Sequence, residues 1–343
     1  MNGETILKVE NLKKFFPIRR GVLSTVVGHV RAVDGVSLEI KSGEALGLVG
    51  ESGCGKTTIG KTLIRLYQAD GGSAVYDGLD IFALRKHELK ELWKRMQIIF
   101  QDPYSSLNPR MTIQKIVGEP LKRFRLVPAG GIKDVVAEII AKIGLNQDHL
   151  GRYPHEFSGG QRQRIGIARA LVGRLVTEYP KMIICDEPVS ALDVSIRAQI
   201  LNLLRHLQKE FQLTLLFISH DLSVVEHVCD RVAVMYLGRI VEVAGRDSLY
   251  RNPLHPYTQA FMSAIPPPEP VAEGLQKRII LKGDIPSIIS PPTGCYFHTR
   301  CPYVFERCRE EYPELQRAGE GHQVACHLRK EVGATGRSPL QAI

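Results

Sequence analysis

The chain has 343 residues, of which 44% are hydrophobic and 24% are charged, and its formal net charge is +9. This composition is typical of a globular chain with a sizeable core, and the length predicts two or three domains. No segment approaches the roughly 20 apolar residues that span a bilayer. Residues 1–5 lack a basic region followed by an apolar stretch, so no signal peptide is visible and we expect a cytoplasmic chain.

The N-terminal region predicts short strands separated by tight turns. Residues 5–16 alternate between apolar and polar side chains, as an edge strand does, and Pro17 is expected to end that strand. A second strand pair is expected at residues 30–40, and a small β region at residues 70–78. Between them, residues 45–49 (ALGLV) form an apolar run typical of a buried strand.

Residues 50–57 (GESGCGKT) have the pattern of a phosphate-binding P-loop between that strand and a helix beginning near Lys56. Glycines let backbone N–H groups approach phosphate oxygens, and the amino end of the helix adds unpaired donors and a positive dipole. Lys56 would reach the β- and γ-phosphates, and the Thr57 hydroxyl would bind Mg²⁺. The sequence therefore predicts a nucleoside triphosphate site, with candidate residues Gly50, Glu51, Ser52, Gly53, Cys54, Gly55, Lys56, Thr57 and Thr58.

The middle of the chain combines a basic segment with helical patterns. Residues 85–125 contain ten Lys or Arg against four Asp or Glu. A basic face can meet lipid headgroups, nucleic acid or an acidic protein, or it can be an ordinary solvated helix face. The elements expected here are helices at residues 86–96, 113–124 and 132–143, and a short buried strand at residues 96–100 that ends at Gln101.

Two carboxylates follow another apolar strand. Asp186 and Glu187 come directly after residues 182–185 (MIIC). In open parallel α/β sheets, ligands bind at the carboxyl ends of the strands. Asp186 can therefore hold Mg²⁺, directly or through water, and Glu187 can orient and deprotonate an attacking water. The elements expected next are a helix at residues 196–211, a strand at residues 213–219 that ends at His220, and a hairpin at residues 232–243.

A second glycine-bearing turn opens a helix at residues 157–164 (FSGGQRQR), which makes it another natural anion site. One chain rarely needs two such sites for one phosphate. The arrangement makes sense if two chains pair, so that this turn closes over the nucleotide held by the partner's P-loop.

In order and spacing, these motifs resemble an ABC-type ATPase cassette over residues 5–250. The resemblance implies an α/β fold with a RecA-like core, an antiparallel β subdomain and a helical subdomain at about residues 102–172. Together these parts would form an ATPase domain at residues 1–250. Its substrate would be ATP with Mg²⁺.

The same resemblance implies a role for each site residue. Phe16 would stack on adenine, with Phe15 as the alternative. Gln101 would contact Mg²⁺ together with Thr57 and Asp186, and would relay the nucleotide state to a membrane partner. The residues that would bind the nucleotide across a dimer are Ser158, Gly159, Gly160 and Gln161 of the signature turn and Asp193 of the D-loop. The catalytic residues would be Glu187, His220 and Gln101, with His220 holding the γ-phosphate and the attacking water.

A narrower resemblance connects the chain to ATPase subunits of bacterial dipeptide and oligopeptide importers. It is carried by residues 103–110 (PYSSLNPR), 152–155 (RYPH) and 255–258 (HPYT) and by the C-terminal cysteines. The opening, with residues 13–17 (KKFFP) and an insertion before residue 32, is similar to the second, F-type, paralogue.

This narrower resemblance implies peptide import, with nickel or other peptide-like cargo as alternatives. The implied partners are a paralogous ATPase or a second copy, two transmembrane permease subunits and, indirectly, an extracytoplasmic substrate-binding protein. The chain would lie at the cytoplasmic face of the cell membrane, with no nucleic-acid partner. A hypothesis of another class is a soluble ABC ATPase acting on nucleic acid or ribosomes through the basic segment.

The C-terminal region predicts little regular structure. We expect a short helix at residues 255–263, a stiff proline-rich linker at residues 264–270, a C-terminal domain at residues 251–331 and a frayed tail at residues 332–343.

Four of the seven cysteines, namely Cys295, Cys301, Cys308 and Cys326, lie in this region, and Cys54, Cys185 and Cys229 are scattered through the cassette. A disulfide does not suit the cytoplasm, and a small irregular domain needs another stabilising element. The gaps are longer than those of paired zinc ligands, and four thiolates match a 4Fe–4S cluster. Because the resembled importers carry such a cluster here, we expect a structural 4Fe–4S centre; zinc and four unrelated thiols are the alternatives.

Overall fold

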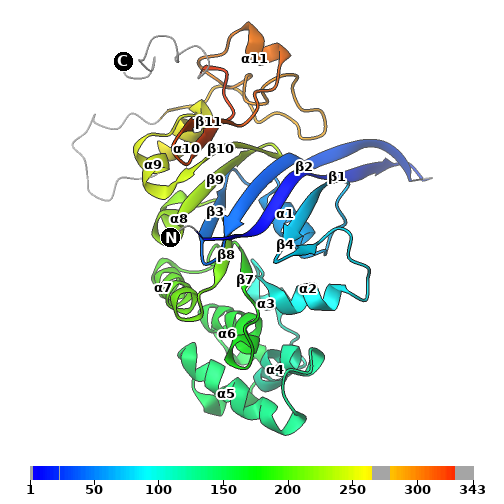
Figure 1. The fold of residues 1–343 in the computed structure, drawn as a ribbon, viewed down its shortest axis with the longest axis vertical. Coiled ribbons are helices and arrows are strands. Elements are labelled where there is room, and N and C mark those ends of the chain that lie inside the picture. The colour runs from blue at the N-terminus through cyan, green and yellow to red at the C-terminus, as the bar shows by residue number, and fades with distance from the viewer. Residues whose placement is uncertain (1–2, 23, 265–278, 329–343) are drawn as a thin grey trace.

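The computed structural model describes residues 3–22, 24–264 and 279–328. Its strands form a four-stranded antiparallel sheet, in the order β2-β1-β4-β5, and an eight-stranded mixed sheet, in the order β11-β12-β10-β9-β3-β8-β7-β6 (Figure 1). The small sheet packs over one side of the large one, and a helical part lies below them in Figure 1. This is the predicted α/β arrangement of a core, an antiparallel β part and a helical part.

The antiparallel sheet is built on a long hairpin of β1 (Thr5–Arg20) and β2 (Thr25–Lys41), which projects from the body of the molecule in Figure 1. Pro17 lies inside β1, so the expected strand end there is wrong, and β1 is not an edge strand because it also pairs with β4. That second pairing stops at Lys13, so Pro17 lies where β1 has one partner only and its missing N–H costs no ladder bond. The remaining strands are β4 (Gly71–Tyr76) and β5 (Leu79–Asp80).

The centre of the large sheet is parallel and buried. β3 (Ala45–Val49) lies between β8 (Thr214–Ser219) and β9 (Arg231–Tyr236), and all of its residues are buried. The predicted strands β6 (Met96–Ile99) and β7 (Met182–Asp186) continue the parallel order. Because parallel strands end at one edge, the residues after β3, β6, β7 and β8 meet there.

The helices confirm the helical patterns of the sequence. α1 (Lys56–Leu63) begins at the predicted lysine. The helical part at the lower end of Figure 1 packs the apolar faces of its helices against one another, including Ile116, Val117 and Ile139. The helices of the first 230 residues are α1, α2 (Leu89–Arg95), α3 (Pro103–Ser106), α4 (Ile113–Arg123), α5 (Ile132–Lys142), α6 (Gly159–Leu171), α7 (Val194–Phe211) and α8 (Leu222–Val228).

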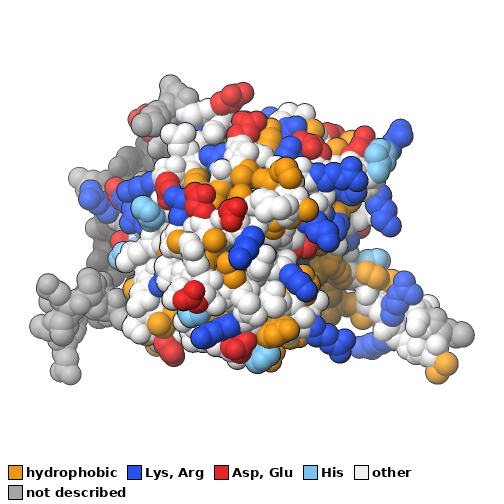
Figure 2. All heavy atoms as spheres, turned by 90° about the horizontal axis from the view of Figure 1, so that it is seen from below, with side chains coloured by type: hydrophobic (Ala, Val, Ile, Leu, Met, Phe, Trp, Pro, Cys, Tyr) orange, Lys and Arg blue, Asp and Glu red, His pale blue; other side chains and the backbone are white. Residues whose placement is uncertain are grey.

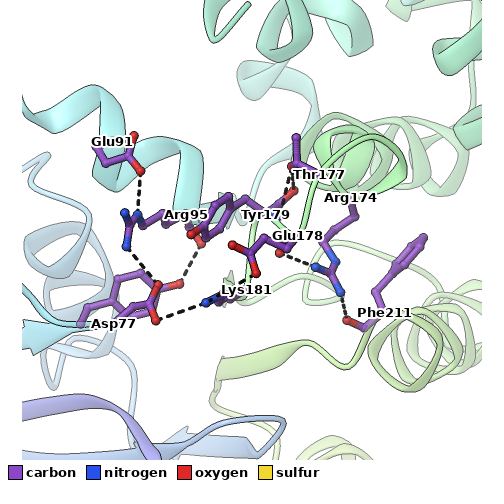
Figure 3. Close-up of polar contacts among 10 residues, drawn as sticks. Asp77, Glu91, Arg95, Arg174, Thr177, Glu178, Tyr179, Lys181 and Phe211 are labelled. Carbon is purple, nitrogen blue, oxygen red and sulfur yellow. Dashed lines mark hydrogen bonds and ion pairs between the residues drawn. The ribbon is translucent and has the colours of Figure 1, made fainter. Parts of the chain in front are cut away.

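The segment that returns from α6 to β7 is fixed by a polar network (Figure 3). Asp77, in the turn between β4 and β5, pairs with Arg95 of α2 at 3.2 Å and with Lys181 at 3.4 Å. Arg174 donates to the carbonyls of Glu178 and Phe211. The network therefore ties the antiparallel sheet, α2 and the end of α7 to the amino ends of β6 and β7, opposite the edge where the site lies.

The C-terminal part adds two strands to the edge of the large sheet. β10 (Arg239–Gly245) pairs with β9 on one side and with β12 (His322–Val324) on the other, and β11 (Gln316–Gly319) pairs with β12. The helices of this part are α9 (Arg246–Arg251), α10 (Pro256–Met262) and α11 (Glu306–Glu310). The sequence predicted α10 and the β9–β10 hairpin but neither β11 nor β12.

The expected linker lies almost wholly, and the tail wholly, outside the described residues. Among the residues that are described, no helix is long and apolar enough to cross a bilayer.

Candidate nucleotide site

The loop between β3 and α1 is shaped by glycines that cannot be replaced without collision. Gly55 has φ +108, and a Cβ there would lie 1.9 Å from the carbonyl oxygen of Ala32. Gly50 has φ +156, and a Cβ there would lie 2.1 Å from the carbonyl oxygen of Met235. The backbone of the loop is thus pressed against neighbouring strands, which leaves its N–H groups to turn toward the sheet edge.

Lys56 is 4% exposed and folds back over this loop. Its Nζ donates to the carbonyl oxygens of Gly50 at 2.7 Å and Glu51 at 2.9 Å. Its third acceptor is Cys54 Sγ at 3.7 Å. An ammonium group that meets only neutral acceptors in the loop fits a triphosphate, whose oxygens are stronger acceptors.

Thr57 and Asp186 bring two oxygen ligands together below the loop. The Thr57 Oγ1 donates to Asp186 Oδ1 at 2.7 Å. Asp186 is 2% exposed, and burial raises the pKa of its carboxyl above the ordinary value. Buried hydroxyl and carboxylate oxygens at one point suit Mg²⁺, which takes oxygen ligands and favours the charged carboxylate. These residues therefore fit the predicted metal.

Glu187 is the centre of a second polar group beside the loop. Gln101 Nε2 donates to Glu187 Oε2 at 3.0 Å, and His220 Nδ1 lies 3.1 Å from Glu187 Oε1. The backbone of Glu187 has φ 46, a conformation that non-glycine residues rarely adopt and that often marks a functional position.

Most of these groups face one open cavity of about 620 Å³, but Gly50, Glu51, Cys54 and Asp186 do not line it. A space of this size matches a nucleotide-sized ligand. It is lined by Ala32, Ser52, Gly53, Gly55, Lys56, Thr57, Thr58, Gln101, Asp102, Glu187, Ser190, Ala191 and His220. The sheet edge thus brings together the predicted residues Ser52, Gly53, Gly55, Lys56, Thr57, Thr58, Gln101, Glu187 and His220, and Asp186 joins them through its contact with Thr57.

Comparison with known proteins assigns this site to a family. The family model described as "ABC transporter" matches residues 33–190, and that described as "Oligopeptide/dipeptide transporter, C-terminal region" matches residues 241–308. The chain is 54% identical to the oligopeptide transport ATP-binding protein AppF of Bacillus subtilis, over 95% of this chain and 98% of that protein. The chain belongs to the oligopeptide transport ATP-binding proteins of the ABC transporter family. It is therefore an ABC-type ATPase subunit, as its motifs predicted.

Other relatives and solved structures agree with that placement. OppF of Salmonella typhimurium, also an oligopeptide transport ATP-binding protein, is 48% identical over 94% of this chain and 96% of its own length. Together with AppF it confirms the F-type resemblance. The ATP-binding cassette MJ0796, solved as a dimer bound to ADP and Pi, has a TM-score of 0.61 and 26% identity, and covers 70% of this chain and 98% of that one. CbiO1 of Clostridium perfringens has a TM-score of 0.60 and 27% identity, and covers 73% of this chain and 92% of that one.

The signature turn of this ABC ATPase lies apart from the cavity. Ser158 is the N-cap of α6: its Oγ accepts from the Gln161 N–H at 3.3 Å, and the Gln161 side chain accepts from the Ser158 N–H at 3.0 Å. A Cβ on Gly160 would lie 2.4 Å from Ile196. Ser158, Gly159, Gly160, Gln161 and Asp193 are not among the residues that line the cavity. In a single chain these residues do not complete the nucleotide site.

Phe16 is half-buried and lies near the base of the projecting hairpin. Its ring packs edge-on against Tyr67, with 5.3 Å between centroids, and Lys14 Nζ lies 5.3 Å from its centroid. Neither Phe16 nor Phe15 lines the cavity, so the assignment to adenine stays a prediction.

Sequence reasoning missed two C-terminal residues that contact the P-loop. Tyr257 Oη accepts from the Glu51 N–H at 3.0 Å, and Arg300 Nη1 lies 3.3 Å from the Glu51 carboxylate. The motif at residues 255–258 drew attention to Tyr257, but the sequence did not predict its contact with Glu51. Arg300 stands in an irregular stretch without a pattern.

The expected 4Fe–4S cluster is wrong, and so is the zinc alternative. Within residues 3–22, 24–264 and 279–328, no group of three or more His, Cys, Asp or Glu side chains could hold a metal ion, and the relatives named above are described as ATP-binding proteins alone. Burial raises the pKa of Cys295 to about 11 and of Cys326 to about 12, which favours thiols over the thiolates that bind metals.

The C-terminal region is stabilised without a metal, by contacts that an irregular sequence does not reveal. β12 joins the large sheet, and Tyr296 Oη donates to Asp34 Oδ2 at 2.7 Å. Phe297 is 1% exposed and packs against Tyr236 and Tyr257, with centroids 5.3 and 5.6 Å apart. Apolar packing and strand pairing therefore do what the predicted cluster was expected to do.

Proposed function

We propose that this chain hydrolyses ATP to power the import of dipeptides and oligopeptides through a membrane transporter. The observation that carries the proposal is Glu187, held between Gln101 and His220 beside a P-loop. The relatives AppF and OppF are oligopeptide transport ATP-binding proteins, which supports peptide as the cargo.

In the proposed reaction, the P-loop N–H groups and Lys56 bind the phosphates of ATP. Thr57, Asp186 and Gln101 would hold Mg²⁺, which supplies charge neutralisation at the β- and γ-phosphates when bound. The Glu187 carboxylate accepts a proton from the attacking water, whose oxygen bonds to the γ-phosphorus as the bond to the β–γ bridging oxygen breaks. His220 orients that water and the γ-phosphate, since it already lies against Glu187.

Two ATPase chains are needed in this proposal. The signature turn, Ser158–Gln161, and Asp193 lie away from their own cavity, so they can act only on the nucleotide of another chain. The amino end of α6 offers N–H groups to a γ-phosphate. The other chain would be a paralogue or a second copy, and a dimer is the form in which the similar cassette MJ0796 was solved.

The proposed membrane partners are two permease subunits, reached from the cytoplasmic face. Figure 2 views the molecule from the end that carries the helical part, where Lys and Arg side chains gather toward the right. Gln101 lies at the start of the helical part, between β6 and α3. A permease segment that contacts this part would move when the bound nucleotide changes from ATP to ADP. A substrate-binding protein outside the cell would take part only indirectly.

The test uses the chain expressed with its permease and ATPase partners and placed in lipid vesicles. We expect ATP-dependent uptake of labelled dipeptides and oligopeptides, but not of Ni²⁺, and none with Glu187→Gln. Uptake of Ni²⁺ alone would overturn the peptide assignment. Purification without any permease, together with tight salt-sensitive nucleic-acid binding, would favour the alternative of a soluble ATPase, which the relatives do not support.

A further inference from the structure

Glu51 of the P-loop is fixed at each of its three polar groups. Its carbonyl accepts from Lys56 at 2.9 Å within the loop. Its N–H donates to Tyr257 Oη at 3.0 Å, and its carboxylate pairs with Arg300 Nη1 at 3.3 Å. The last two contacts come from residues 206 and 249 positions further along the chain. The C-terminal part therefore reaches the phosphate-binding loop directly.

The Tyr257 hydroxyl is held in place by a series of buried contacts. Tyr257 is 1% exposed and lies in the first turn of α10. Its N–H donates to His255 Nδ1 at 3.0 Å, and the His255 N–H donates to the buried Glu242 carboxylate at 2.9 Å. Burial lowers the pKa of His255 to about 4, so its ring stays neutral and can accept this bond. The hydroxyl oxygen is thus anchored to β10 of the large sheet.

Arg300 is anchored in a similar way. Its side chain is 9% exposed, and its backbone N–H donates to the Phe297 carbonyl at 3.0 Å. Its Nη1 also donates to Tyr236 Oη at 3.4 Å. A guanidinium buried this far costs free energy unless a negative charge faces it, and Glu51 supplies that charge.

The charge of Glu51 matters because it belongs to the loop that binds a triphosphate. Its carboxylate is 26% exposed, so water screens it only in part. Without a counter-charge it would add negative charge to the loop that binds the phosphates of ATP, and like charges disfavour each other in a partly buried site.

We propose that Arg300 and Tyr257 are positioning residues of the ATP site: Tyr257 orients the peptide of residue 51, and Arg300 neutralises its carboxylate. The C-terminal part thereby sets the affinity of the P-loop for ATP. This inference rests on the proposed nucleotide site but does not depend on transport or cargo.

The test is equilibrium binding of a fluorescent ATP analogue with Mg²⁺ to the full-length chain in its complex, in the forms Arg300→Gln, Arg300→Lys, Glu51→Gln and the double variant Glu51→Gln/Arg300→Gln. We expect Arg300→Gln to raise Kd about tenfold, which corresponds to about 1.4 kcal/mol. Arg300→Lys should stay within about threefold of the parent, and the double variant should recover most of the loss, because no uncompensated carboxylate is left. Tyr257→Phe should raise Kd severalfold, since the Glu51 N–H loses its acceptor.

Arg239→Gln is the matched control. Arg239 also links the C-terminal part to the core, pairing with Asp34 at 3.1 Å and lying 4.0 Å from the Tyr312 ring centroid, but it makes no contact with Glu51. Its Kd should match the parent.

Failure of the parent to bind ATP would refute the proposed function itself. Binding by the parent with an unchanged Kd in Arg300→Gln would refute only this inference, as would a loss that Glu51→Gln does not relieve. If Arg300→Gln does not fold, the Kd of Glu51→Gln for the ATP analogue tests the proposal by itself. This variant should bind ATP at least as tightly as the parent because the loop then carries no carboxylate at residue 51 to repel the phosphates, and weaker binding would overturn the proposal.

Discussion

The carboxyl edge of the large sheet and the C-terminal part each carry several chemically reactive side chains, but they use them differently. At the sheet edge, Thr57 meets Asp186 and Glu187 meets Gln101 and His220 within about 3 Å. In the C-terminal part, Cys295, Cys301, Cys308 and Cys326 form no metal-binding group among the described residues. Among the polar side chains of this part, Tyr257 and Arg300 reach the P-loop at the sheet edge.

The difference shows where a fold concentrates chemistry. Parallel strands deliver the residues that follow them to one edge, whatever their separation in sequence. The C-terminal part has two short strands, so its side chains are placed by packing rather than by a shared edge. Variants at the sheet edge should therefore change the chemistry, and variants in the C-terminal part should change the stability.

The sharpest test of the sheet edge is Glu187→Gln. We expect kcat for ATP hydrolysis to fall about a thousandfold while ATP remains bound, because water activation is lost but the phosphate contacts survive. Trapped nucleotide and released phosphate are measured on the same complex. Glu226→Gln, an exposed acid of α8, is the control and should keep parental rates. If Glu187→Gln hydrolysed ATP at the parental rate, Glu187 would not be the general base at the carboxyl edge of the sheet.

Lys56→Ala should weaken ATP binding at least about a hundredfold, since the loop loses its one buried ammonium among the described P-loop residues and its charge-assisted bonds to phosphate. Equilibrium binding of a labelled ATP analogue measures this. Lys61→Ala is the control, because Lys61 lies one turn further along α1 and does not line the cavity. Equal losses in both variants would mean that general charge, not position in the loop, controls affinity.

In the C-terminal part, apolar packing should contribute more to the free energy of unfolding than the cysteine thiols do. Phe297→Ala removes a 1% exposed ring from the contact with Tyr236 and Tyr257, and should lower the free energy of unfolding by about 3–5 kcal/mol. Cys301→Ser, at a partly exposed position, should cost less than about 1 kcal/mol. Urea unfolding of the two variants compares them. If Cys301→Ser lowered the free energy of unfolding more than Phe297→Ala does, the cysteines would have a structural role after all.

The free energy of unfolding should also depend on pH through His255. Burial holds the pKa of His255 at about 4, below the roughly 6.5 of an unfolded chain, with Glu242 the charged group beside it. Between about pH 6.5 and pH 4, the His255 ring therefore binds a proton in the unfolded state but not in the folded state. The free energy of unfolding should fall by up to about 3 kcal/mol as the pH drops from about 6.5 to about 4.

His255→Asn keeps an acceptor for the Tyr257 N–H and does not titrate. Its unfolding free energy should show a shallower decline over the same range. An identical decline in both proteins would assign the effect to other groups.

These contrasts also explain what could be predicted from the sequence. The P-loop, Asp186 and Glu187 were predicted from their places at the ends of apolar strands, and strand ends converge. Gln101 and His220 also stand at strand ends, but their roles were predicted from the resemblance to ABC cassettes. β1 was predicted too short because the rule that proline ends strands ignores whether a neighbouring strand needs its N–H. β12 has three residues, too few to show a pattern.

The cysteine centre was predicted from spacing and resemblance, but sequence gaps do not determine distances in an irregular segment. Contacts such as Arg300 with Glu51 join positions 249 apart, and no local signal reports them.

The pairing of β12 with β10 has a consequence for protein synthesis. His322 of β12 contacts Glu242 of β10 across 80 positions of sequence. At about 5–20 residues per second, β10 leaves the ribosome roughly 4–16 s before the strand that covers its edge. During that interval the apolar edge of β10 is open to pairing with other nascent chains. Any fragment that ends before residue 322 keeps this edge open permanently, and we expect such fragments to aggregate in proportion to their rate of synthesis.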